Sequence, residues 1–166
     1  MALTKVQIGM TDAPTSGTAV TASGTSVDFN SIPSTAKRIT VMFGAVSGNG
    51  SSVKIVQIGT SGGIQTTGYV GASQEGATGT QFPTNGLSVE AGTSAATIIN
   101  GIATLTLLDA TTGIWAFSGS TGRSTTASAT TFGGSKTLSG VLDRVRITTA
   151  NGTDTFDAGT INIMWE

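Results

Sequence analysis

Side chains suited to catalysis are few in this chain. Its 166 residues include no His and no Cys, which removes the commonest general base, a thiolate nucleophile and any disulfide. Nine acidic residues are present, and a pair such as Asp109 and Asp143 would suit glycosidase chemistry, which needs two carboxylates across a cleft. Solvated turn carboxylates are the simpler interpretation, because the sequence gives no separation for any pair. The composition therefore favours a protein that is not an enzyme.

Large rings with polar atoms are candidate ligand contacts, because sugar-binding surfaces often use a ring with an apolar body and a polar edge. Tyr69 lies among glycines and Trp115 follows a turn, so these two are the candidate surface contacts. Packing in a loop or in the core is the alternative for both. Trp165 alternates with Ile161 and Ile163 and is expected in the core.

A cluster of oxygen-bearing side chains near the C-terminus is the only candidate metal site. Asn151, Asp154 and Asp157 in NGTDTFD could offer three ligands to a hard cation such as calcium. Their spacing does not match an EF-hand loop, and Asn-Gly is itself a strong turn signal. We therefore expect these side chains to form hydrogen bonds within their own turn, and we expect neither a metal nor another cofactor.

Charge is low and balanced. The chain has 8 Lys and Arg against 9 Asp and Glu, a net charge of -1, so nucleic acid and anionic lipid surfaces are not expected partners. No stretch approaches the ~18 consecutive apolar residues of a membrane span. Polarity comes instead from 31 Thr and 18 Ser residues, together with 24 Gly. Because threonine is β-branched, this composition favours strands over helices.

Alternation with a period of two predicts several strands. In Arg38–Val46 it places Ile39, Val41, Phe43 and Ala45 on one face. The turn-forming segment 47–52 predicts a hairpin to the apolar strand 53–58. A second hairpin is expected, in which strand 98–108 continues through the turn 109–113 into the segment IWAFSG. Exposed glycine- and serine-rich loops are expected at 59–86, with short β pieces such as Ile64–Val70 among them, and at 118–131, and a turn is expected at 132–136.

The segment Leu142–Glu166 predicts two strands that form a core hairpin at the end of the chain. Val145 and Ile147 alternate in the first strand, and Ile161, Ile163 and Trp165 alternate in the second. Residues 1–24 differ, because they contain repeated Thr, Ser and Gly without sustained alternation. They predict an extended N-terminal arm, which is either a flexible leader or an attachment peptide.

Frequent turn signals between strands predict an all-β fold, an antiparallel β-sandwich of jelly-roll-like form, with a barrel as the alternative. The expected organisation is an N-terminal attachment arm over residues 1–24 and a β-sandwich domain over residues 25–166. No segment shows the capped 3.6-residue periodicity of a helix.

Three segments resemble the C-terminal β-sandwich modules of tail-fibre and other virion proteins of tailed bacteriophages. They are IPSTAKRITVMFGAVSGNGSSVKIVQIGTSGGIQTTGY (32–69), GIATLTLLDATTGIWAFSG and the closing LSGVLDRVRITTANGTDTFDAGTINIMWE. The opening MALTKV is similar to the start of phage tail-fibre and tailspike proteins, where that end attaches to the virion. The chain departs from these proteins in having no long fibrous shaft.

The resemblance implies a homotrimeric virion protein, held to other virion proteins by its arm, that binds a host surface glycan or protein receptor. It transfers no functional residue. The alternative is a capsid or tail decoration protein that cements the particle and meets no receptor, and a polysaccharide-trimming enzyme is a more remote one. Recognition is expected in the loops 59–86 and 118–131.

Overall fold

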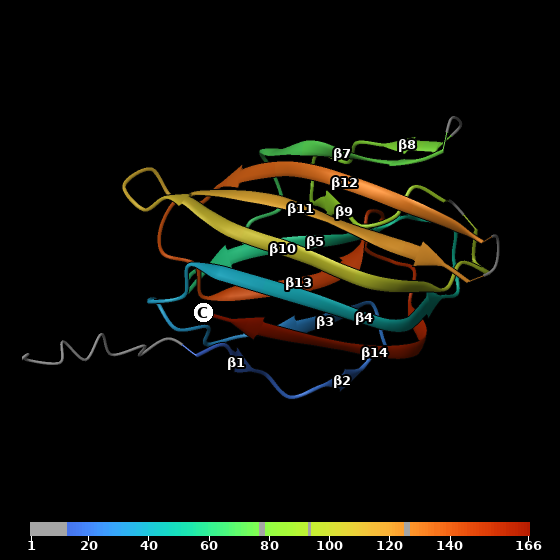
Figure 1. Cartoon of the computed structure of the whole chain (residues 1–166), viewed down its shortest axis with the longest axis horizontal. Coiled ribbons are helices and arrows are strands. Elements are labelled where there is room, and N and C mark those ends of the chain that lie inside the picture. The colour runs from blue at the N-terminus through green and yellow to red at the C-terminus, as the bar shows by residue number, and fades with distance from the viewer. Residues whose placement is uncertain (1–12, 77–78, 93, 125–126) are drawn as a thin grey trace, which may run out of the picture.

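The computed structural model describes residues 13–76, 79–92, 94–124 and 127–166. Two antiparallel sheets of nine and five strands pack face to face (Figure 1). Within the described residues every regular element is a strand. The prediction of an all-β antiparallel sandwich is confirmed.

The larger sheet has the strand order β1-β14-β4-β10-β11-β12-β7-β8, with β2 also paired to β14. Because β10, β11 and β12 follow one another in both chain and sheet, the centre of this sheet is a meander. The strands are β1 (Thr15–Ser16), β2 (Val20–Thr21), β4 (Arg38–Gly48), β7 (Tyr69–Glu75), β8 (Gly79–Gln81), β10 (Ile99–Asp109), β11 (Ile114–Arg123), β12 (Ser128–Thr137) and β14 (Phe156–Trp165).

The smaller sheet has the order β3-β13-β5-β6, and β9 also pairs with β5. Its strands are β3 (Ser26–Phe29), β5 (Lys54–Thr60), β6 (Gly63–Ile64), β9 (Leu87–Ser88) and β13 (Arg144–Thr149). The apolar return strand predicted at 53–58 is the central β5, and its residues from Lys54 to Gly59 are all buried. Burial on both sides explains why it shows no polar face.

The core consists of the inward-facing rows of both sheets. Ile39, Val41, Ala103, Leu105 and Ile161 from the larger sheet have no exposed surface. The smaller sheet contributes four equally buried side chains, from Val56, Ile58, Val145 and Ile147. The predicted alternation in 38–43, 98–107 and 144–147 therefore places the correct residues inside.

The C-terminal segment forms two strands, but the predicted hairpin is wrong. β13 pairs with β3 and β5 in the smaller sheet, whereas β14 pairs with β4 in the larger one. The connection 150–155 crosses from one sheet to the other. The predicted hairpin at 47–52 is wrong for the same reason, because β4 and β5 also lie in different sheets. A turn signal marks where the chain reverses, but it does not say which partner the next strand takes.

A backbone irregularity changes the face of one predicted core residue. Ala45 is exposed, with φ of 53°, and its N–H donates to the Asn100 side-chain oxygen at 2.8 Å. Beside it, Gly159 has φ of +96°, and a Cβ there would lie 2.4 Å from the Ala45 carbonyl oxygen. This bulge shifts the alternation by one residue, so Val46 is buried in place of Ala45.

The segments predicted to be loops are largely strands. Residues 59–86 include β6, β7 and β8, and residues 118–131 include the end of β11 and the start of β12. The turn expected at 132–136 lies within β12. Ser, Thr and Gly are common in loops, but in a sheet with one uncovered face they also fill the outward positions of strands.

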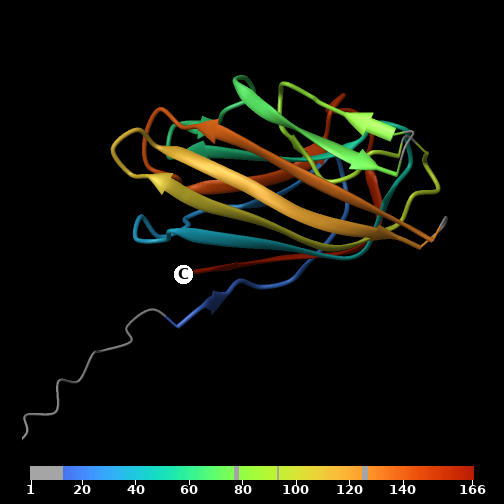
Figure 2. The ribbon, with the colours of Figure 1, turned by 45° about the horizontal axis from the view of Figure 1, so that its top comes forward.

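The described part of the N-terminal arm lies along β14 at the edge of the larger sheet (Figure 2). Gly17 and Ala22 donate backbone hydrogen bonds to Ile163 and Gly159, at 2.8 and 2.9 Å. Residues 1–12, including the opening MALTKV, lie outside the described residues. From residue 13 to residue 24 the arm forms an edge of the sheet that is largely exposed, with Ala22 buried in the core.

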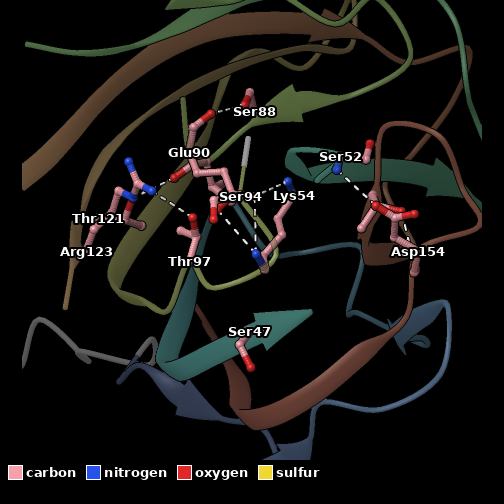
Figure 3. A network of polar contacts seen from close by, with 12 residues as sticks. Ser47, Ser52, Lys54, Ser88, Glu90, Ser94, Thr97, Thr121, Arg123 and Asp154 are labelled. Carbon is pink, nitrogen blue, oxygen red and sulfur yellow. Dashed lines mark hydrogen bonds and ion pairs between the residues drawn. The ribbon is translucent and has the colours of Figure 1, made fainter. Parts of the chain in front are cut away.

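A buried ion pair fixes the crossing segment 87–92 against β5. The Lys54 ammonium lies 3.2 Å from the Glu90 carboxylate, and the Lys54 backbone N–H donates to the same oxygen at 2.7 Å. Both side chains are under 5 % exposed, and Figure 3 shows them pointing toward each other. Burial raises the pKa of Glu90 despite the attraction of Lys54. Nearby, Arg123 donates to Glu75 and to Thr97.

Substitutions at neighbouring positions of β14 should differ sharply in their effect on the free energy of unfolding, because only one of the two side chains faces the core. Ile163→Ala should lower the free energy of unfolding by about 2–5 kcal/mol, because it leaves a cavity in the core. Met164→Ala, on the half-buried outward face, should cost less than about 1 kcal/mol. Urea unfolding followed by circular dichroism measures both.

Deleting residues 161–166 should abolish folding, and a truncated protein that still melts cooperatively would place the core elsewhere.

The buried pair predicts strong coupling between its members. Glu90→Gln leaves the Lys54 charge unpaired and should destabilise the fold by about 3–5 kcal/mol. The double variant Lys54→Met with Glu90→Gln should recover much of that loss, because it buries no charge and keeps an acceptor for the Lys54 N–H.

The exposed pair Arg146–Asp28 is the matched control for this cycle. Its guanidinium makes two 2.7 Å hydrogen bonds to the carboxylate, and Arg146→Gln should cost under about 1 kcal/mol. Additive effects of the Lys54 and Glu90 substitutions in urea unfolding would contradict the coupling.

Candidate functional site

Three connections meet at one end of the sandwich, at the left of Figure 1, and a pocket opens among them. These are the β3–β4 connection, the β10–β11 turn and the β12–β13 connection. The pocket has a volume of about 330 Å³, at the lower end of the range for small-ligand sites, about 300–1,000 Å³. We call it the end pocket. Its lining residues are Ser34, Ala36, Lys37, Leu107, Ala110, Thr111, Thr112, Gly113, Trp115, Leu138, Ser139, Gly140, Val141 and Leu142.

The inner wall of the end pocket is a continuation of the core. Trp115 lies opposite Leu107 in the β10–β11 register, and Leu138 and Leu142 belong to the same buried cluster. Trp115 is only 3 % exposed, so it contributes part of a wall and not a free ring. Apolar side chains of β10, β11 and the β12–β13 connection thus give the pocket a rigid apolar base.

The mouth of the end pocket is polar, with one exposed apolar side chain. Ser34, Thr111, Thr112 and Ser139 are exposed and carry hydroxyls. The Ser139 hydroxyl accepts the Gln65 side-chain amide at 2.6 Å and the Thr112 hydroxyl donates to Asp109, so Ser139 can still donate to a ligand and Thr112 can still accept from one. Val141 is 64 % exposed. Apolar walls below and hydroxyls above are the combination expected for a small ligand with many hydroxyls of its own.

Local hydrogen bonds hold the β10–β11 turn in place beside the pocket. The Asp109 carboxylate accepts the Thr111 N–H at 2.8 Å and the Thr112 hydroxyl at 3.0 Å. These bonds lower the pKa of Asp109, with the Thr111 N–H as the largest cause. Gly113 has φ of +70°, and a Cβ there would lie 2.8 Å from the Leu138 carbonyl oxygen. Glycine is required where the two connections come this close.

The two aromatic candidates prove to be buried. The ring of Tyr69 is 3 % exposed, and its hydroxyl accepts the Ile58 N–H at 2.8 Å and donates to the Gln65 carbonyl at 2.7 Å. Burial raises the pKa of Tyr69 to about 12. The prediction of a surface contact is wrong for Tyr69, because its polar atom is satisfied inside the protein. For Trp115 the exposed ring is wrong, but the residue does line the end pocket.

The three candidate metal ligands are engaged by protein donors. Asp154 accepts the Ser52 N–H at 2.9 Å and the Asn151 side-chain amide at 2.7 Å, and these bonds lower the pKa of its carboxyl. Asp157 instead accepts the Ser47 hydroxyl. The described residues contain no group of three or more acidic side chains that could hold a metal ion. The turn with internal hydrogen bonds expected from the sequence accounts for Asn151 and Asp154.

The suggested carboxylate pair does not line the end pocket. Asp109 is held by its own turn, and Asp143 is bound by the Arg144 guanidinium at 2.7 Å. The lining residues include one charged side chain, Lys37, and no carboxylate. The pocket therefore offers contacts for binding and no pair of groups for general acid–base chemistry.

The outward side of the larger sheet is a second surface of note, with two rows of aligned side chains that carry no charge. The first row is Met164, Thr40, Thr104, Ser118, Gly133 and Ala72; the second is Asn162, Met42, Ile102, Ser120, Thr131 and Gln74. We call this the uncharged face. A shallow hollow of about 260 Å³ lies on it beside β8. Hydroxyl and small side chains alternate on this face with the larger Met42, Met164 and Ile102, so it offers another protein both apolar contact and neutral hydrogen-bonding groups.

Sequence reasoning identified Trp115 but missed the rest of the end pocket. Lys37, Thr111 and Val141 lie in three connections far apart in the chain, and only the sheet topology brings them together. One local signal was available, because the connection 138–143 (LSGVLD) contains three apolar residues, which is unusual for a loop that makes no apolar contact.

Comparisons of the chain with protein-family models, with curated proteins and with solved structures find no match. The part of the chain that the structure describes contains no helix long and apolar enough to cross a membrane.

Proposed function

We propose that this protein is a virion structural protein of a tailed bacteriophage that binds glycan on the host cell surface through the end pocket. The observation that carries the binding role is the pocket itself, in which apolar walls lie beneath a mouth of hydroxyls. The place on a virion rests on the resemblance of residues 32–69 and of the closing segment to phage β-sandwich modules.

A sugar ring suits these contacts. Its C–H faces pack on apolar walls such as Leu107 and Trp115, and its hydroxyls bond with Ser and Thr side chains at the mouth. The volume of about 330 Å³ fits the end of a glycan chain better than a long internal stretch. Three copies in a homotrimer, held to other virion proteins by the arm, would raise weak single-site affinity by avidity.

A decoration protein that cements the capsid or tail is the second candidate function. The uncharged face supports it, because a broad surface without charge can pack on a neighbouring subunit with no cost of burying an ion. The two functions use different surfaces of the molecule. Substitutions on one surface therefore separate them.

Intrinsic fluorescence provides a direct test of the end pocket. The chain has two Trp residues, and only Trp115 lines the pocket. In a Trp165→Phe variant the emission of Trp115 should change on titration with oligosaccharides from bacterial lipopolysaccharides and capsules. In the same variant, Val141→Ala should weaken binding by about fivefold, because apolar contact is lost.

Val70→Ala is the matched control, since Val70 is also an exposed valine, 70 % exposed, but lies on β7 away from the pocket. It should leave the affinity unchanged.

Ser118→Glu places a charge on the uncharged face and should leave glycan binding intact. If Ser118→Glu abolishes attachment to particles and no oligosaccharide perturbs Trp115, the decoration function replaces the receptor-binding one.

A further inference from the structure

The charged side chains around the end pocket are paired, with one exception. Arg38 lies 2.5 Å from Glu166, and Arg144 lies 2.7 Å from Asp143. Asp109 is capped by the N–H of Thr111 and the hydroxyl of Thr112. Among the described residues, no carboxylate lies within ion-pair distance of the Lys37 ammonium.

The backbone of Lys37 is fixed at the pocket wall. Its N–H donates to the Glu166 carbonyl at 2.6 Å, and its carbonyl accepts the Leu107 N–H at 2.8 Å. The residue is thereby held between the start of β4 and the end of β10. Its side chain is exposed and lines the pocket, so the ammonium is available to a ligand in the mouth.

From this arrangement we infer that the end pocket selects an acidic sugar, one that carries a carboxylate, and that Lys37 is the residue that recognises the charge. This inference rests on the proposed glycan-binding function and specifies its ligand. The pocket lining supplies one cation and no carboxylate to oppose it. A hydrogen bond to a charged group is stronger than one between neutral groups, so the acid is favoured over the matching neutral sugar.

A carboxylate fits these donors better than a phosphate. Lys37 provides one positive charge, which balances the single negative charge of a carboxylate, whereas a phosphate monoester carries a charge of about −1.5 to −2 at pH 7 and the lining contains no second cation. The other polar groups at the mouth are neutral hydroxyls of Ser34, Thr111, Thr112 and Ser139. They suit the hydroxyls of the same sugar ring and add no further positive charge.

The test uses pairs of oligosaccharides that differ only at the terminal ring, one ending in a hexose and the other in the corresponding hexuronic acid. A third member ends in the hexose 6-phosphate. Calorimetry or Trp115 fluorescence gives each affinity. The wild-type protein should prefer the uronate by about tenfold, and the preference should shrink as salt concentration rises.

Lys37→Gln should remove the uronate preference and its salt dependence while leaving the affinity for the neutral sugar within about twofold. Lys37→Arg should retain most of the preference. Arg146→Gln is the matched control, because it removes the same charge at a site where the guanidinium is already bound to Asp28. It should leave the preference intact, and an unchanged melting temperature confirms that each variant is folded.

The outcomes separate this inference from the function on which it rests. Equal binding of hexose and uronate, or a preference that survives Lys37→Gln, overturns the role of Lys37 and leaves glycan binding standing. A stronger preference for the phosphate overturns the choice of carboxylate. If no member of any pair binds the wild-type protein, the glycan-binding function fails, and the inference fails with it.

Discussion

Packing of the two sheets against each other is the interaction on which the rest of this structure depends. The inward rows of β4, β10 and β14 meet those of β5 and β13 in one continuous cluster. The end pocket lies where the two sheets separate at one end of that cluster, so its apolar wall is made of core residues such as Trp115 and Leu138. The site inherits its rigidity from the core, since its base cannot move without opening the interior.

Several of the few ionic side chains in the described residues connect parts of the fold. Lys54 and Glu90 anchor a crossing segment inside the protein, and Arg146 joins β13 to β3 through Asp28 at the surface. With a net charge of -1, the protein has little long-range field to attract or repel a partner. Selectivity for a ligand must then come from local contacts, so the accessible Lys37 ammonium at the mouth of the end pocket has a large effect on which ligand binds.

Period-two alternation predicted the sandwich and its main core residues, because burial of one face leaves a direct mark on a strand. Ile39, Leu105, Val145 and Ile161 were all assigned correctly. Pairing partners were not predictable in the same way, since β13 and β14 obey the same alternation whether they share a sheet or not. The bulge at Ala45 shifted the alternation by one residue, and the residue types around it give no sign of this backbone irregularity.

The site was harder to predict than the fold for a physical reason. A pocket at the end of a sandwich is assembled from connections, and Lys37, Thr111 and Val141 come together only after three different strand pairs have formed. Trp115 could be identified from its type, but its burial depends on packing against β10 and β12. Glycine- and serine-rich stretches misled in the opposite direction, because β12 uses such residues on the open side of the sheet.

The position of β14 has a consequence for how the molecule folds. This strand, formed by residues 156–165, lies between β4 and the arm strands that begin at Thr15, so the larger sheet joins segments from opposite ends of the sequence. Closing loops of that length is entropically costly, and chains dominated by such distant contacts fold slowly. Until β14 docks, β4 presents an open sheet edge to other chains. Docking of β14 therefore joins distant parts of the sequence and, in the same step, covers a sheet edge that could otherwise pair with another chain.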